Sequence, residues 1–168
     1  MRTALRGDDP AFFFEHRALL DSAQARRPYP GDEYCLPFGQ ATWLMEGNRL
    51  TVVTWGAMVY RCLAASDPFR GQVTLLDLRT ILPWDSHAVL ESVSQTGKLL
   101  VDHEDTITVG FAAEIIATVA GRAFAELDAP LTRIATPDVP IPFNRGMMEA
   151  VIPDEASIRA KISELLAY

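Results

Sequence analysis

The chain has 168 residues, of which 49% are hydrophobic, a balance typical of one soluble globular domain with a packed core. The formal net charge is −7, with 22 acidic side chains against 15 lysines and arginines, so the chain lacks the basic character that nucleic acid binding needs. No apolar run reaches the ~18 residues of a membrane span, and the first residues do not form a secretory signal. We therefore expect a cytoplasmic protein that binds neither nucleic acid nor membrane.

The first 39 residues differ in pattern from the rest of the chain. The apolar run at 11–16 (AFFFEH) predicts a strand, and the prolines and glycines of 22–39 predict an irregular connection. One strand with a long irregular tail cannot form a domain by itself. We therefore interpret residues 1–39 as a linker or arm, and residues 40–168 as the folded domain.

A regular pattern begins at residue 40. Strand-like runs at 40–45 and 50–55 surround a Glu-Gly-Asn turn and predict a hairpin. Helical spacing follows over 57–65, and the run at 73–78 predicts the next strand. Asp85 is the predicted N-cap of a further helix, and Gly97 is predicted to end it.

The second half of the chain continues this alternation. Strands are predicted at 98–102 and 130–135, and apolar residues three to five apart predict a long helix over 111–127. The prolines of 136–153 predict a long loop, after which Asp154 caps a last helix. Alternating strands and helices predict a three-layer α/β/α sandwich, with a mostly parallel five-stranded sheet and one antiparallel edge strand.

Polar residues gather where the predicted strand 98–102 ends, and sites in open α/β sheets lie at such ends. His103 is a candidate general acid or base, with Glu104 beside it. Three interpretations of this polar cluster remain open. It could be a structural pair, part of an active site completed by another chain, or a metal site that would need His16 or His87. A right-handed crossover from 73–78 to 98–102 would also make Arg79 and Glu104 neighbours, so we predict that they pair.

Several familiar catalytic motifs are absent. The sequence has no glycine-rich phosphate loop, no G-x-S-x-G elbow and no cysteine in a zinc-binding pattern. The proline-rich loop at 137–144 is long, and its Ile141 and Phe143 would suit either an interface or a cover over the sheet end.

In this order, the motifs resemble the C-terminal domain of the β-subunit of thiamine-diphosphate-dependent 2-oxo acid dehydrogenases, the E1 component. The resemblance extends over essentially the whole chain. It rests on FFFEHRALLD (12–21), LPFGQA (36–41), LTVVTWGAMV (50–59), DLRTILPWD (77–85), TGKLLVDHED (96–105), GFAAEI (110–115), LDAPLTRIATPD (127–138) and VPIPF (139–143). The LRTILPWD form is most like the branched-chain enzymes, and the pyruvate and acetoin enzymes are also similar.

The resemblance implies a transketolase C-terminal fold. In the family, thiamine diphosphate and Mg lie between the E1 α-subunit and the N-terminal domain of the E1 β-subunit, and no residue of this chain corresponds to those that bind them. We therefore expect the isolated chain to bind no cofactor and to be inactive. Residues 1–39 would then link to the missing N-terminal domain, and a subunit domain without its partners should self-associate.

The resemblance also implies docking of the acyltransferase (E2) through its peripheral-subunit-binding domain. In relatives, an acidic residue in an L-E-A-P segment and the terminal carboxylate take part, and Asp128 and Tyr168 stand at those places here. The chain departs from the family at Val109-Gly110, where relatives have Gly-Gly. The two functions left open are a domain that contributes to oxidative decarboxylation, and a docking or oligomerisation module without activity.

Overall fold

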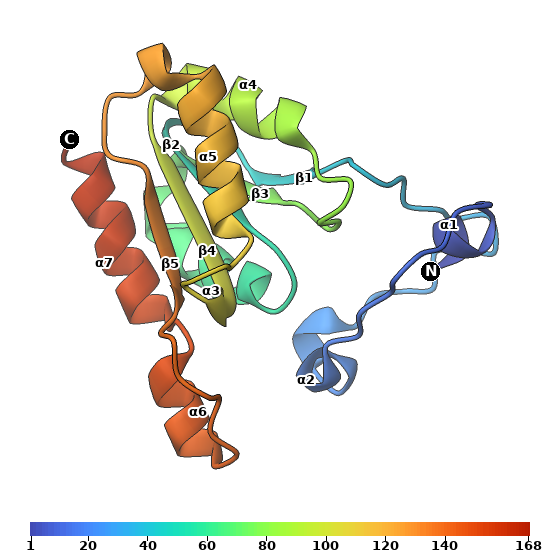
Figure 1. Cartoon of the computed structure of the whole chain (residues 1–168). Helices are drawn as coiled ribbons and strands as arrows, with labels where there is room; N and C mark the ends of the chain where they lie inside the picture. The colour runs from blue at the N-terminus through green and yellow to red at the C-terminus, as the bar shows by residue number, and fades with distance from the viewer.

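The computed structural model describes residues 1–168 and contains one five-stranded sheet with the strand order β1-β3-β2-β4-β5 (Figure 1). The strands are β1 (Thr42–Met45), β2 (Gly47–Thr54), β3 (Gly71–Asp77), β4 (Leu99–Thr106) and β5 (Thr132–Thr136). The longer helices are α3 (Met58–Ser66), α4 (Ser86–Thr96), α5 (Ala112–Arg122), α6 (Arg145–Val151) and α7 (Glu155–Leu166). None of the helices is long and apolar enough to cross a membrane.

Helices cover both faces of the sheet, so the predicted α/β/α sandwich is confirmed (Figure 1). Neighbouring residues of a strand point to opposite faces. Val52 accordingly packs in the cluster formed with α3 and α7, and Val53 packs in the cluster formed with α4 and α5. These two clusters of buried hydrophobic residues form a frame on which the strands hold polar side chains.

The predicted antiparallel edge strand is present, but the predicted hairpin is wrong. β1 pairs antiparallel with β3, with Thr42 opposite Asp77, whereas β2 pairs parallel with β3. The Glu-Gly-Asn segment does not form a turn, because β2 begins at Gly47 and only one residue separates it from β1. A Cβ at Gly47 would collide with the backbone of Gln72 and Val73, so glycine allows this crossing of β3.

Three of the predicted helix ends are confirmed. The Asp85 carboxylate accepts a hydrogen bond from the Ala88 N–H at 3.0 Å, and α4 ends at Gly97 with a left-handed φ of 67°. Asp154 and Ser157 form a reciprocal capping box at the start of α7. These caps fix where the helices begin and end relative to the sheet.

Two helix predictions need correction. The helix predicted over 111–127 is shorter, since α5 ends at Arg122 and the chain continues as a 3₁₀ turn, Phe124–Glu126. The loop predicted over 136–153 contains α6, whose N-cap Asn144 accepts a hydrogen bond from Met147 N–H. The asparagine was the available sequence signal, and the surrounding prolines obscured it.

Residues 11–16 do not form the predicted strand. The segment is irregular and is flanked by two short helices, α1 (Arg2–Leu5) and α2 (Arg17–Leu20). A strand needs a neighbour to accept its backbone hydrogen bonds, and no strand of this chain lies beside the segment. Its apolar side chains are consequently exposed, with Phe12 at 91% and Phe14 at 89%.

Candidate functional site

His103 lies in the second half of β4 and is fully buried. Its ring stacks on Trp55 from β2, with the centroids 5.4 Å apart and the planes 9° from parallel. A Cβ at Gly110 would overlap the His103 ring, so the loop before α5 closes directly over it. Neither ring nitrogen has a hydrogen-bond partner. Burial lowers the pKa of His103 and so favours the neutral imidazole; nearby Asp105 opposes this change and Arg133 adds to it.

Glu104 points to the other face of the sheet, because neighbouring residues alternate along a strand. Its carboxylate pairs with His16 of the N-terminal arm, with 3.1 Å between Nε2 and Oε1. The structure therefore does not bring His103 and Glu104 together as an acid–base pair. The contact with His16 was not foreseen, since the two residues are 88 positions apart in the sequence.

The predicted pairing of Arg79 with Glu104 is wrong. The crossover from β3 to β4 passes over β2, which lies between them, and a sequence pattern does not show how many strands a crossover skips. Arg79 instead donates to the Gln40 carbonyl at 2.7 Å, and its N–H donates to the Asp77 carboxylate at 3.0 Å. Arg79 thus ties the start of the domain to the end of β3.

Asp102 is a buried carboxyl group that the sequence analysis did not single out. It is fully buried between β4 and α3, where the Cys62 thiol donates a hydrogen bond to its Oδ2 at 3.1 Å, and its Oδ1 has no partner. Burial raises the pKa of Asp102 to about 7, against the lowering effects of Cys62 and Arg61, while Glu104 adds to the rise. The sequence contained one sign of this burial: residues two apart on a strand share a face, so Asp102 lies on the same face as the apolar Leu100.

The loop between β4 and α5 is held in a strained conformation. Thr108 donates to the Asp138 carboxylate from its N–H at 3.0 Å and from its hydroxyl at 2.5 Å. Val109 follows with a positive φ of 65° and a side chain that is 93% exposed. A β-branched residue is disfavoured at such a backbone angle, so Val109 has a local energetic cost that a glycine, as expected from the family resemblance, would avoid.

A polar hollow of about 290 Å³ lies at the opposite end of the sheet, where β2 and β4 begin. Asp128 is exposed at this hollow, and its N–H donates to the Gly97 carbonyl at 2.8 Å. Its carboxylate lies against Gly97, so Asp128 sits at the C-terminus of α4 and not at the end of α5. No apolar residue lines the hollow, which is formed by Asn48, Arg49, Ser94, Gln95, Thr96, Gly97, Lys98, Glu126 and Asp128.

Tyr168 lies at this same end of the molecule, where the C-terminus and the chain leading into β5 are found (Figure 1). Its side chain is 65% exposed. Arg49 donates to the Leu166 carbonyl at 2.7 Å and so connects the last turn of α7 to the hollow that Asp128 lines. The structure thus places the two predicted docking residues, Asp128 and Tyr168, on one end of the domain.

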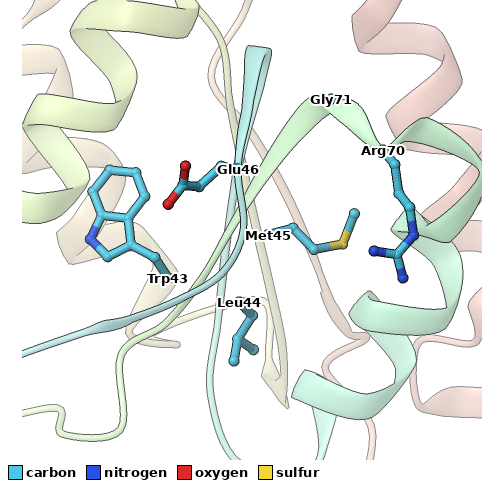
Figure 2. A pocket seen from close by; sticks show the side chains of 6 residues that line it. All are labelled: Trp43, Leu44, Met45, Glu46, Arg70 and Gly71. Carbon is cyan, nitrogen blue, oxygen red and sulfur yellow. The ribbon is translucent and has the colours of Figure 1, made fainter.

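A second hollow, of about 320 Å³, lies along the exposed edge strand β1 (Figure 2). Figure 2 shows Trp43 and Glu46 on one side of the strand and Met45 and Arg70 on the other. Arg70 is already paired with Asp67 at 2.7 Å. The charged side chains that line this hollow, Glu46 and Arg70, point to opposite sides of β1 (Figure 2). None of the residues predicted to be functional lines this hollow.

Comparison with known proteins identifies the class of this domain. A family model described as the C-terminal domain of transketolase matches residues 39–158, and the chain belongs to this family. A structure titled as an inactive β4 tetramer of a split-gene transketolase shares the fold, with a TM-score of 0.68 and 20% identity over 80% of this chain and 44% of that one.

Sequence relatives narrow the class. The chain is 40% identical over 144 residues to the mitochondrial 2-oxoisovalerate dehydrogenase subunit beta 2 of Arabidopsis thaliana, covering 83% of this chain and 39% of the relative. It is 33% identical to the 2-oxoisovalerate dehydrogenase subunit beta of Bacillus subtilis, covering 100% and 52%. The pyruvate dehydrogenase E1 component subunit beta of the same organism is 36% identical, covering 86% and 45%.

The chain is thus a transketolase C-terminal domain that is similar to E1 β-subunits of the 2-oxo acid dehydrogenases, in agreement with the resemblance of its sequence motifs. It spans about half the length of these curated relatives, or less. A β-subunit of an acetoin oxidoreductase from Cupriavidus necator is also 36% identical, over 94% of this chain and 46% of the relative, so identity alone does not select a substrate.

Proposed function

We propose that the chain contributes subunit assembly and E2 docking to the oxidative decarboxylation of a 2-oxo acid, with a branched-chain substrate favoured. The observation that carries the docking role is the shared location of Asp128 and Tyr168 at the amino end of the sheet. The branched-chain preference is supported by the LRTILPWD segment and by the 2-oxoisovalerate dehydrogenases among the relatives.

The electrostatics of the docking end favour a basic partner. Helices of a parallel α/β sandwich run opposite to the strands, so α4, α5 and α7 all end there and direct the negative ends of their dipoles outward. Glu126 and Asp128 add two carboxylates beside the hollow. An acidic carboxylate at the C-terminus of α4 is unfavourable to that helix, which fits recognition of an external cation better than helix stability.

Binding to the peripheral-subunit-binding domain of an E2 tests the docking role. We expect saturable binding that weakens with added salt, because exposed charges are screened. Asp128→Ala and a short C-terminal extension should each raise the Kd about tenfold, the size of one charge-assisted contact, mostly through the off-rate. Asp105→Ala, which removes an exposed carboxylate at the other end of the sheet, is the matched control. Unchanged affinity in both docking variants would refute the assignment.

The cofactor is proposed to bind outside this chain, with an E1 α-subunit and an E1 β N-terminal domain supplying its site. In family members thiamine diphosphate is held with Mg, and no group of three or more His, Cys, Asp and Glu side chains here is arranged to hold a metal ion. The chain thus offers no preformed metal cluster for the metal–diphosphate part of the cofactor. We derive no catalytic step for His103 or Glu104 and assign them no catalytic role.

Residues 1–39 are proposed to link this domain to the N-terminal domain. Phe12 and Phe14 are almost fully exposed, and the 139–143 loop exposes Ile141 at 49% and Phe143 completely. Apolar surface of this kind is usually covered by a partner. In the absence of the other subunits we expect the chain to associate with itself. Light scattering that shows a monomer at high concentration would contradict this expectation.

A further inference from the structure

Arg49 has contacts that the proposed docking role does not yet explain. It lies near the start of β2, and its guanidinium donates to the Gln72 side chain at 3.1 Å and to the Leu166 carbonyl at 2.7 Å. It also lines the polar hollow beside Asp128. The Arg49 side chain therefore connects β3 to the end of α7, and it does so at the edge of the hollow.

The contact with Leu166 acts on a segment that has few other restraints. The last carbonyls of a helix have no partner within the helix, and terminal residues fray unless something holds them. After Leu166, Ala167 makes one backbone hydrogen bond to Glu164 and Tyr168 is exposed. A guanidinium at this position satisfies one free carbonyl and favours the negative end of the helix dipole.

We propose that Arg49 is a positioning residue of the docking surface: it fixes the last turn of α7, and with it Tyr168, relative to Asp128. This inference rests on the docking role proposed above. Removing Arg49 loosens the C-terminal residues, so that a partner must order them when it binds, and the affinity falls.

The direction of the change in affinity on replacing Arg49 distinguishes a positioning role from a purely electrostatic one. The proposed partner is basic, so removing a cation from the docking end would tighten binding if only charge mattered. Positioning gives the opposite result. We expect Arg49→Gln to weaken binding of the peripheral-subunit-binding domain about tenfold, the size of one charge-assisted hydrogen bond. Arg49→Lys keeps a donor for the Leu166 carbonyl and should restore most of the affinity.

A double-mutant cycle tests whether Arg49 acts through the C-terminus. In the chain with a C-terminal extension, which already lacks the native contact of Tyr168, Arg49→Gln should change the affinity less than about twofold. Lys161→Gln removes a cation from the exposed side of α7 and is the control for net charge. Wild-type or tighter binding by Arg49→Gln, or a full loss that persists in the extended chain, would overturn the proposal.

A second measurement does not depend on docking. Carboxypeptidase should remove Tyr168 from the Arg49→Gln variant several times faster than from the wild type, because the fixed conformation protects the end. Equal rates would overturn the positioning role even if docking occurs. A wild-type chain that binds no E2 domain, but whose C-terminus is protected by Arg49, would instead refute the docking role alone.

Discussion

Replacing Asp102 with asparagine should remove a strong pH dependence of stability. Burial raises the pKa of Asp102 from 3.8 to about 7 in the folded chain, so between these values the folded state holds a proton that the unfolded state has released. The free energy of unfolding therefore falls as the pH rises through this window. Three pKa units correspond to about 4 kcal/mol in total, of which about 3 kcal/mol should be lost between pH 5 and pH 8.5.

The Asp102→Asn side chain is neutral at every pH and close in shape to the protonated acid. Its amide can still accept the Cys62 thiol, although its buried N–H₂ group costs about 1–3 kcal/mol. The variant should thus match or fall below the wild type at pH 5 and exceed it by about 1–3 kcal/mol at pH 8.5.

Urea unfolding followed by circular dichroism at pH 5 to 8.5 measures both chains. Asp105→Asn, at an exposed carboxylate on the same strand, controls for the loss of a carboxyl group. The control should keep the wild-type slope. A wild-type stability that does not change over this range, or that falls equally in Asp102→Asn, would refute the assignment of the slope to this buried acid.

Three further substitutions test the carboxyl end of the sheet. Val109→Gly should raise the free energy of unfolding by about 1 kcal/mol, because it relieves a positive φ at an exposed side chain; a loss of stability would show that the valine side chain has a packing role. Gly110→Ala should destabilise by at least about 1–3 kcal/mol, since the added methyl group meets both the Thr106 carbonyl oxygen and the His103 ring, and a shift of the His103 NMR signals should accompany the loss. Glu104→Gln should cost less than about 1 kcal/mol in urea unfolding, because the pair with His16 is one-third exposed on both sides; a loss of several kcal/mol would indicate a further buried partner.

The order and type of most elements could be predicted from the sequence because they depend on local signals. Asp85, Gly97 and Asp154 mark helix ends through their own hydrogen bonds and backbone angles, and these predictions are confirmed. The fold class followed from the alternation of strands and helices. The segment at 11–16 shows the limit of this reasoning, because its apolar pattern predicts a strand but this chain supplies no neighbouring strand.

Long-range pairing could not be read from the sequence. β1 lies next to β3 and not β2, since the single residue between β1 and β2 leaves no room for a hairpin turn. Arg79 and Glu104 are separated because β2 lies between β3 and β4, and the partner of Glu104, His16, is 88 positions away in the sequence. Asp102 escaped notice because its surroundings are made by α3, which the sequence does not place against β4.

The most direct test of the assignment is a calorimetric titration of thiamine diphosphate with Mg into the purified chain, alone and mixed with E1 α-subunit and E1 β N-terminal-domain chains. The proposed role as one domain of a larger enzyme predicts no saturable binding to the chain alone and binding with 2-oxo acid decarboxylation in the mixture. Tight binding or decarboxylation by the chain alone would contradict it.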